Sequence, residues 1–270
     1  MKFFLNSAIR RDETRLKGGT MRIIQGILLA LMLIFLNTSV LAGGNQTIDS
    51  FSEAKRQLKK VYADHRTTFY CQAPYKKDGS VEAPQGFESP KFAKRSKKIE
   101  WEHIVPAENF GRAFPEWREG HEACVDSKGK PFKGRKCAEK VNKEFQFMVS
   151  DMYNLVPAIG SVNAMRSNFN FTEMHPSVEN TFGTCPVKIV NRTVEPGEYS
   201  KGSIARTYFY IESKYPTFKI SDKMRKLLSV WNKRYPVDKW ECERALRIEK
   251  IQKNRNDIVM DQCKIFGFVP

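Results

Sequence analysis

A carboxylate beside an imidazole is the first arrangement in this sequence that could both bind a cation and move a proton. Glu102 and His103 lie in the segment 99–105, which is typical of a strand that enters a turn at Pro106. Neighbouring side chains on a strand point to opposite faces, but near a strand end that alternation relaxes, so both groups could reach one site. The carboxylate suits a hard cation, and an imidazole with a pKa of about 6.5 suits proton transfer. By itself, such a pair is more often a surface Glu beside a half-buried His.

Two asparagines further along the chain could complete a cation site with neutral oxygen ligands. Asn154 begins the run NLVP, and Asn163 follows nine residues later in a short helix predicted over about 161–169. One carboxylate and one amide would leave a divalent ion most of its charge and several water positions, which suits an ion that also binds phosphate oxygens. In isolation, an Asn pair is usually found in turns or at helix caps.

Hydrophobic spacing and caps predict the elements that must hold these residues. Ser50 and Glu53 are spaced as a capping box, so a helix should begin there. The segment 145–156 has an apolar pattern that should stop at Pro157. Two stretches are rich in Lys and Gly and are predicted to be long basic loops, namely 72–98 and 111–143.

The last third of the chain is predicted to be mainly helical. The segment 203–215 fits a helix or a strand, and its spacing favours a helix. A firmer helix runs through 224–231 and ends before Pro236, and the spacing of Asp238 and Glu241 is that of another helix cap. We find no internal repeat and no linker, so the sequence predicts a single α+β domain with long basic loops.

Composition and net charge indicate what kind of molecule this protein binds. The 270 residues are 41% hydrophobic and 12% aromatic, which supports a real core and excludes a disordered chain. Lys and Arg number 46 against 30 Asp and Glu. Six of those cations and two of those anions lie in the first 42 residues, so the remainder keeps a net charge of +12. Such a balance suits a polyanionic partner.

The N-terminal region is typical of an export signal. An apolar run over 27–36 follows Arg22, and Val40 and Ala42 fit a signal-peptidase site with cleavage after Ala42. Met21 is a candidate start, which would make the preceding residues an extension. The alternative is an uncleaved membrane anchor, but ten apolar residues are short for a span of about 20. We therefore expect a leader over 1–42, a working domain over 43–270, and no stable membrane association after cleavage.

The cysteines indicate disulfides. All six lie after the leader and none forms a CxxC pair, which argues against a zinc ribbon. An even number after a signal peptide implies disulfides in an oxidising compartment, and buried free thiols are the alternative. Only the pair Cys124 and Cys137 is a local prediction, because it would close a Lys- and Gly-rich loop. The complete set is Cys71, Cys124, Cys137, Cys185, Cys242 and Cys263.

Several longer motifs resemble one known family. The stretches WEHIVPAENFG, SDMYNLVPAIGSVN, NFNF, GSIARTYFY and WNKRYPVDKWECERALRIEKIQ resemble the bacterial endonuclease I family. The resemblance covers the chain from about residue 51 to residue 263. It implies a periplasmic or secreted non-specific nuclease with a ββα-metal site, also called a His-Me finger.

The resemblance assigns roles to matching positions. His103 matches the catalytic base that activates water, and Glu102 matches a metal-binding carboxylate. Asn163 matches the metal-binding Asn, and Asn154 matches a more structural Asn in the strand–helix turn. Arg166 is expected to contact phosphate.

A further position is expected to steady the cleaved phosphate. Arg135 looks like the family's Arg with that role, although family members commonly have one more residue before the following Cys. Lys133 or Lys136 could substitute for it only as point charges.

Other positions depart from the family pattern. Tyr153 stands where a His is common, and Ala164 and Met165 replace a Gly-Asp pair. The run 253–256 lacks the His of the family's usual Gly-Asn-His-Asn, so any role of that His is absent here.

The implied activity is metal-dependent hydrolysis of DNA, and of RNA as well, to products with 5′-phosphate and 3′-hydroxyl ends. Oxygen ligands favour Mg²⁺ over Zn²⁺, with Ca²⁺ or Mn²⁺ as alternatives. Lys/Arg clusters over 91–98 and 128–140 are candidates for phosphate-backbone contacts, or else an ordinary solvated surface. A monomer is the default expectation.

Two alternatives belong to other classes of protein. One is a secreted, non-catalytic nucleic-acid-binding protein that has kept the fold, for which the spacing at Arg135 is the only hint. The other is a basic protein that binds anionic envelope polymers. The second alternative leaves Glu102, His103 and Asn163 unexplained.

Overall fold

The computed structural model describes residues 43–269. The predicted leader, with its candidate start at Met21 and its cleavage after Ala42, lies outside the described residues. Among the described residues, no helix is both long enough and apolar enough to cross a membrane.

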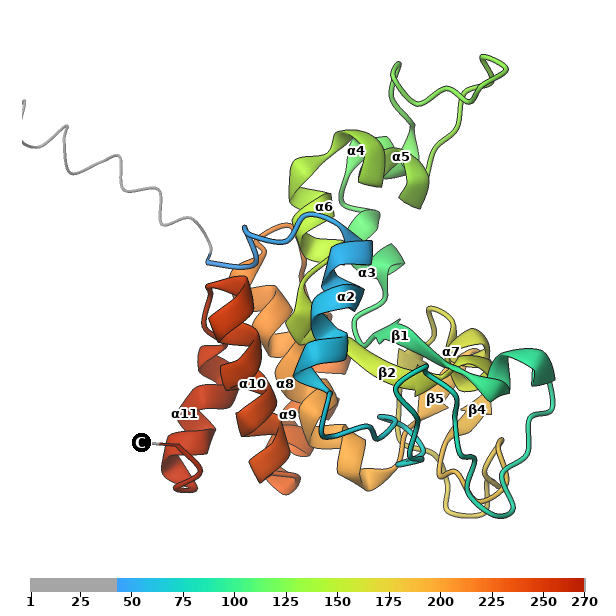
Figure 1. Ribbon diagram of the computed structural model, residues 1–270, viewed down its shortest axis with the longest axis vertical. Coiled ribbons are helices and arrows are strands. Elements are labelled where there is room, and N and C mark those ends of the chain that lie inside the picture. Colours follow the sequence, from blue (N-terminus) through green and yellow to red (C-terminus); the bar gives the residue numbers. More distant parts are fainter. Residues whose placement is uncertain (1–42, 270) are drawn as a thin grey trace, which may run out of the picture. The chain divides into compact units, whose positions relative to one another are not determined.

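Helices of the C-terminal third pack together on one side of the domain (Figure 1). Each of the last three is preceded by a capping residue whose side chain accepts a hydrogen bond from a backbone N–H in the first turn. The capping residues are Ser221, Asp238 and Asn256. The segment 203–214 is helix, as its spacing favoured, and Tyr215 is the residue that follows the helix end. The last helix was not predicted. The four are α8 (Glu198–Lys214), α9 (Asp222–Arg234), α10 (Lys239–Gln252) and α11 (Asp257–Ile265).

Two antiparallel strands and the helix after them form the other side of the domain (Figure 1). Strand β1 (Ile99–His103) pairs with β2 (Leu155–Ile159), and α7 (Gly160–Arg166) follows β2 directly. The prediction that the apolar segment 145–156 stops at Pro157 is wrong. Pro157 lies inside β2 opposite Trp101, and its missing N–H is harmless because β2 is an edge strand of a two-stranded ribbon.

Shorter elements connect these two sides. Ser50 caps the first helix by accepting the N–H of Glu53, but the Glu53 carboxylate binds Arg56, so only half of the predicted capping box forms. The prediction of a loop over 111–143 is wrong in part, because two helices lie within it. The helices are α2 (Phe51–Val61), α3 (Ala107–Gly111), α4 (Pro115–Arg118), α5 (Arg135–Val141) and α6 (Lys143–Val149), with 3₁₀ turns η2 (Ala93–Lys97) and η3 (Met152–Asn154).

A second, three-stranded sheet escaped prediction because its strands are too short to show a period. Its order is β3-β5-β4, from Asn170–Phe171 (β3), Lys188–Val190 (β4) and Thr193–Glu195 (β5). Strand β3 follows α7 closely in the chain, so this sheet continues from the end of the ββα unit.

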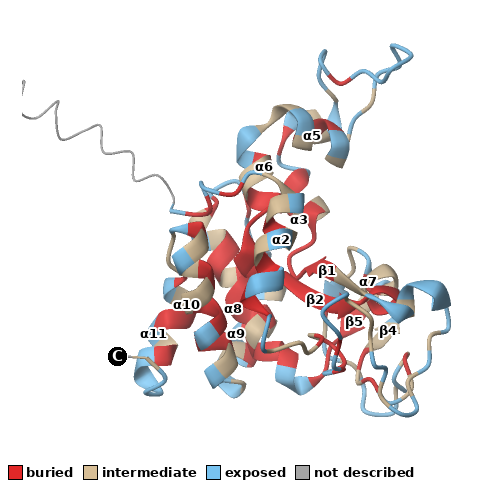
Figure 2. Cartoon of the chain, in the orientation of Figure 1, coloured by how far each residue is buried: buried red, intermediate tan, exposed pale blue. Residues whose placement is uncertain are grey.

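The buried core runs through the helices and beneath the β1–β2 ribbon (Figure 2). At its centre the carboxylate of Asp151 is fully buried and accepts hydrogen bonds from the Tyr210 and Tyr215 hydroxyls and the Gln252 amide. A buried carboxylate is costly unless it is hydrogen-bonded. These bonds tie the turn before β2 to α8 and α10, so the strand starts from a fixed point.

Three disulfides join all six cysteines, as the even count predicted. Cys124–Cys137 forms as the local prediction proposed, and it closes the base of the arm that projects beyond α4 and α5 in Figure 1. The long-range bridge Cys71–Cys185 and the bridge Cys242–Cys263 between α10 and α11 complete the set.

Helix α8 packs so closely on the end of α9 that one position requires glycine. A Cβ added to Gly202 would lie 2.0 Å from the backbone oxygen of Tyr235. We expect Gly202→Ala to lower the free energy of unfolding by about 1–3 kcal/mol in a urea titration, because backbone must move. Ser203→Ala on the same helix is the control and should stay within about 0.5 kcal/mol. An unchanged Gly202→Ala variant would contradict this packing.

Candidate active site

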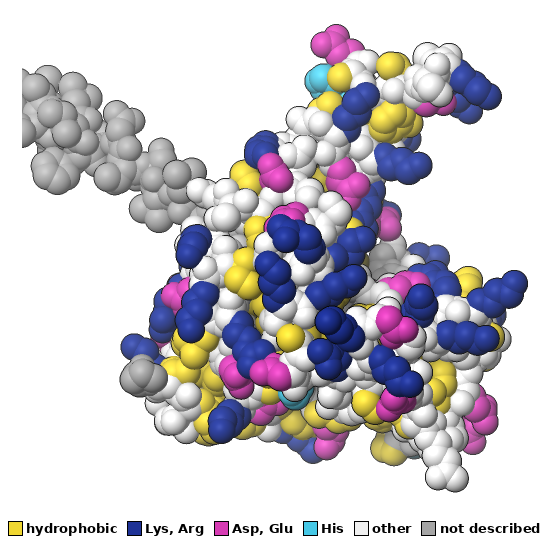
Figure 3. Space-filling model, viewed as in Figure 1, with side chains coloured by type: hydrophobic (Ala, Val, Ile, Leu, Met, Phe, Trp, Pro, Cys, Tyr) yellow, Lys and Arg dark blue, Asp and Glu magenta, His cyan; other side chains and the backbone are white. Residues whose placement is uncertain are grey.

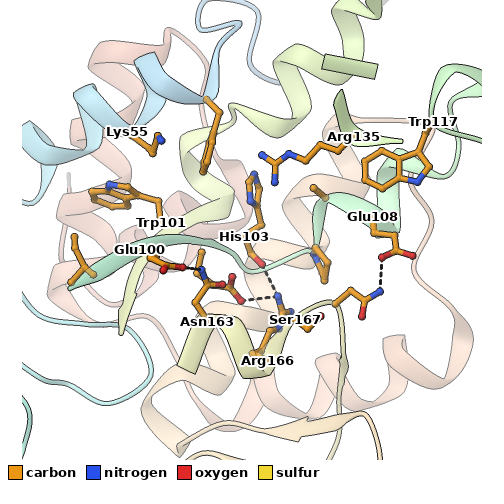
Figure 4. Close-up of a pocket in the computed structure, with 16 residues that line it drawn as sticks. Lys55, Glu100, Trp101, His103, Glu108, Trp117, Arg135, Asn163, Arg166 and Ser167 are labelled. Carbon is orange, nitrogen blue, oxygen red and sulfur yellow. Dashed lines mark hydrogen bonds and ion pairs between the residues drawn. The ribbon is translucent and has the colours of Figure 1, made fainter. Parts of the chain in front are cut away.

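The predicted site residues border one cavity of about 600 Å³ (Figure 4). Glu102 and His103 both remain paired in β1, opposite Val156 and Leu155, so the expected relaxation of the strand end is wrong. Strand alternation persists, and the cavity reaches both faces of β1. In Figure 4 His103 lies on one side of the strand, whereas the side chains from α7 lie on the other.

Glu102 is buried against a guanidinium from α7. Its Oε1 accepts from Arg166 Nη1 at 2.8 Å and from the Tyr70 hydroxyl at 3.5 Å. Burial raises the pKa of the Glu102 carboxyl to about 7, and Arg166 opposes that rise. Among the described residues no side chain or backbone group donates to Oε2. One carboxylate oxygen is therefore available to a ligand.

Arg166 borders the cavity but is almost completely buried, with only 1% of the residue exposed. Besides Glu102, it donates to the backbone oxygens of His103 and Ile104 at 2.7 and 2.6 Å. Its guanidinium also lies 4.7 Å from the Phe171 ring centroid. The expected phosphate contact does not fit this burial. Arg166 instead fixes the end of β1 onto α7.

His103 is buried on the opposite face of β1. Its ring stacks on Phe51 with centroids 5.1 Å apart, and its Nε2 lies 2.8 Å from the backbone oxygen of Val149. A carbonyl only accepts, so Nε2 carries the proton and Nδ1 is left as an acceptor. Burial, with a smaller contribution from the Arg135 charge, lowers the pKa of His103 to about 3. The imidazole is therefore neutral near pH 7.

Asn163 reaches the cavity from the first turns of α7. Its Nδ2 donates to Glu100 Oε2 at 2.7 Å, and Glu100 is in turn paired with Arg95. No described group donates to the amide oxygen of Asn163. Asn163 and Glu102 thus each bring one oxygen without a protein partner to the same cavity.

Arg135 reaches the site despite its altered spacing from Cys137. It is the first residue of α5, lines the cavity, and lies with its guanidinium carbon 5.1 Å from the Phe51 ring centroid. Its Nε donates to Glu139 at 2.7 Å, and about a third of its side chain is exposed. The remaining guanidinium nitrogens have no partner among the described residues, so they can meet an anion.

Asn154 is structural, in line with its expected supporting position. The residue is fully buried, and its side-chain amide exchanges two hydrogen bonds with the backbone N–H and C=O of Val105. These bonds hold the turn after β1 against the start of β2. Asn154 does not line the cavity.

Some residues of the site were not identified from the sequence. Glu100 precedes Glu102 by two positions, so strand alternation could have placed both carboxylates on one face. Phe51 begins the helix that the Ser50 cap predicted, but nothing in the sequence placed its ring against His103. Lys55, Glu108 and Trp117 also line the cavity, but no local pattern brings α2, α3 and α4 to β1.

The Glu102–Arg166 pair generates a stability prediction. We expect Arg166→Met to lower the free energy of unfolding by about 3–5 kcal/mol, because it leaves a buried carboxylate without its partner. The same change in a Glu102→Gln background should cost clearly less. Chemical denaturation of the four proteins in EDTA measures both values. Equal losses in the two backgrounds would mean that packing, and not the charge pair, sets the cost.

Comparison with known proteins places the chain in a family. A family model described as Endonuclease I matches residues 44–263. An extracellular deoxyribonuclease of Aeromonas hydrophila is 38% identical over 244 residues, which cover 88% of this chain and 98% of that protein. A periplasmic deoxyribonuclease of the same organism is 37% identical over 226 residues, covering 81% and 89%. Endonuclease-1 of Buchnera aphidicola subsp. Acyrthosiphon pisum is 38% identical over 224 residues, covering 81% and 83%. The chain therefore belongs to the endonuclease I family, the family that its sequence motifs resemble.

Proposed function

We propose that this protein is a metal-dependent endonuclease that hydrolyses phosphodiester bonds of DNA and RNA without sequence preference. The observation that carries the proposal is one cavity bordered by a neutral imidazole, a partly free guanidinium and two unpartnered oxygens. Phosphodiester hydrolysis needs a proton acceptor for water and positive charge for the phosphate. The names of the related deoxyribonucleases support the same reaction class.

His103 acts as the general base in this proposal. The backbone oxygen of Val149 and the Phe51 ring hold the imidazole in one orientation, with Nδ1 as the atom that takes the proton from water. The low pKa that burial imposes keeps the ring free of a proton before the reaction. An anionic phosphate nearby would raise that pKa, which improves the imidazole as a base when substrate is bound.

Glu102 and Asn163 fit the expected divalent cation. Both offer hard oxygen atoms, and one negative charge with one neutral amide suits Mg²⁺, which keeps several water ligands in protein sites. Ca²⁺ and Mn²⁺ accept the same donors. When bound, the ion would supply positive charge to the phosphate and to the leaving 3′ oxygen.

Arg135 is the group that holds the phosphate released on the 5′ side. Its planar guanidinium can donate two parallel hydrogen bonds to phosphate oxygens, and Glu139 and Phe51 restrict where it lies. Hydrolysis with departure of the 3′ oxygen leaves a 5′-phosphate and a 3′-hydroxyl.

Lack of sequence preference follows from binding through the phosphate backbone. Lys and Arg side chains gather over α2 and toward the η2 turn (Figure 3), where Lys55, Lys59 and Lys60 lie on α2 and Lys94 and Lys97 on η2. Contacts to phosphate give affinity without reading bases. They also do not require a deoxyribose, so RNA is included among the substrates.

The proposed place of action is the periplasm or the medium. Three disulfides and no free cysteine among the described residues suit an oxidising compartment, and the names of the relatives place them there. We propose a monomer as the working unit.

Removing the proposed base should slow cleavage strongly, and removing the cation should stop it. We expect His103→Ala to slow plasmid cleavage in Mg²⁺ by about 10²–10⁴-fold, and EDTA to stop it in the unaltered protein. His175→Ala is the matched control, because His175 is exposed and outside the cavity, and it should cut normally.

Two outcomes would contradict this assignment in different ways. Undiminished cleavage by a purified His103→Ala protein would place the base elsewhere. Tight, salt-sensitive binding of DNA without cleavage in any divalent metal would instead support the non-catalytic nucleic-acid-binding protein.

The ends of the products report on the direction of cleavage. We expect limit digests of duplex DNA and of single-stranded RNA to be substrates for dephosphorylation at their 5′ ends and for direct extension from their 3′-hydroxyls. Fragments that need 3′ dephosphorylation before extension would reject the proposed leaving group. Intact RNA beside fully degraded DNA would restrict the substrate class to DNA.

A further inference from the structure

We infer that Glu100 is a positioning residue, which orients the Asn163 amide so that its oxygen and not its nitrogen faces the cation. The inference deepens the proposed function and rests on it, because Glu102 and Asn163 are the proposed ligands. Glu100 itself is not proposed as a ligand.

The hydrogen bond between the two side chains fixes the orientation. Asn163 Nδ2 donates to Glu100 Oε2 at 2.7 Å. A side-chain amide has an oxygen that accepts and a nitrogen that only donates, so a rotated amide would present its N–H groups to a cation. An ionised carboxylate only accepts. Glu100 therefore binds the nitrogen end, which leaves the oxygen on the other side of the amide (Figure 4).

Arg95 holds Glu100 in place for this role. Its Nε donates to Oε1 at 2.7 Å and its Nη2 to Oε2 at 2.5 Å, so the guanidinium binds both carboxylate oxygens. A planar fork of this kind sets direction as well as distance. Both oxygens of Glu100 are thus engaged, in contrast to Oε2 of Glu102.

The backbone at Gly160 packs closely against Arg95 and Glu100. Gly160, at the start of α7, donates its N–H to the Lys98 oxygen at 3.0 Å. A Cβ on Gly160 would lie 2.5 Å from the Arg95 oxygen and 2.8 Å from Glu100 Oε1. The helix that carries Asn163 therefore starts in direct contact with the residues that orient Asn163.

Strand geometry separates the roles of the two carboxylates. Glu100 and Glu102 share one face of β1 because they are two residues apart. Each has its own arginine, Arg95 for Glu100 and Arg166 for Glu102. Arg95 binds its partner through both oxygens and Arg166 through one, so only Glu102 keeps an oxygen for the ion.

Metal affinity without substrate tests the hydrogen bond directly. We would titrate Mn²⁺ into the oxidised protein by calorimetry and compare Glu100→Gln with Glu100→Met. Both variants are neutral and similar in size, but only Gln keeps an acceptor oxygen for Asn163. We expect Met to weaken Mn²⁺ binding about 10–100-fold, as for other partners of metal ligands, and Gln to weaken it clearly less. Equal affinities of the two variants would overturn the inference.

Removing Arg95 tests whether Glu100 acts as a positioning residue or as a ligand of the cation. If Glu100 orients Asn163, Arg95→Ala should weaken Mn²⁺ binding, because Glu100 loses its support. If Glu100 were a ligand, the same change would free its oxygens and tighten binding, which would overturn the inference. Arg225→Ala is the control, because Arg225 pairs with Glu212 through a similarly exposed contact outside the cavity, and it should leave affinity unchanged.

The same titration distinguishes failure of this inference from failure of the proposed function. Absence of Mn²⁺ binding by the unaltered protein would reject the cation site itself. If the unaltered protein binds Mn²⁺ and all the Glu100 and Arg95 variants bind it with the same affinity, only the role of Glu100 is rejected.

Discussion

The buried guanidinium of Arg166 is the interaction on which the arrangement of the site depends. It donates to Glu102 and to the backbone oxygens of the last residue of β1 and the residue after it, so one side chain fixes both a proposed ligand and the strand that carries it. Arg166 also ends α7, the helix that carries Asn163. A buried arginine is costly without a partner, and Glu102 is that partner. The contact between Arg166 and Glu102 therefore offsets the cost of burying the arginine. The same contact sets the spacing of the two proposed ligands, Glu102 and Asn163.

Strand alternation then divides the chemistry between two faces of β1. Glu102 faces the arginine and α7, whereas His103 faces the Phe51 ring and the end of α6. Both groups are buried, but their neighbours differ. Burial raises the pKa of Glu102 to about 7, and the Arg166 guanidinium opposes that rise. A base must stay neutral, and burial beside a ring and near Arg135 disfavours the imidazolium. Neighbouring residues on a strand supply these separate environments without any special backbone.

The part of the site that could be predicted from sequence is the part encoded in short segments. The motifs around His103 and Asn163 singled out the residues that we propose as base and ligands, and the structure brings them to one cavity. The pairing of Cys124 with Cys137 was local and was predicted correctly. Features that depend on tertiary contacts were missed. Phe51 reaches His103 only because α2 packs beside β1, and Pro157 is tolerated in β2 only because no third strand pairs there. Arg166 was assigned to phosphate because a sequence shows a charge but not its burial.

Charge balance explains why the position in α7 carries an amide and not a carboxylate. Lys55, Arg135 and Arg166 line the cavity together with three carboxylates, Glu100, Glu102 and Glu108, so the formal charges of the lining cancel. An Asp at position 163 would face Glu100 across a hydrogen-bond distance, and two like charges there repel. It would also make the cavity negative, which opposes entry of a phosphodiester. With Asn163 in place, the divalent cation that we propose would make the lining positive when bound, and that charge would attract an anionic phosphodiester.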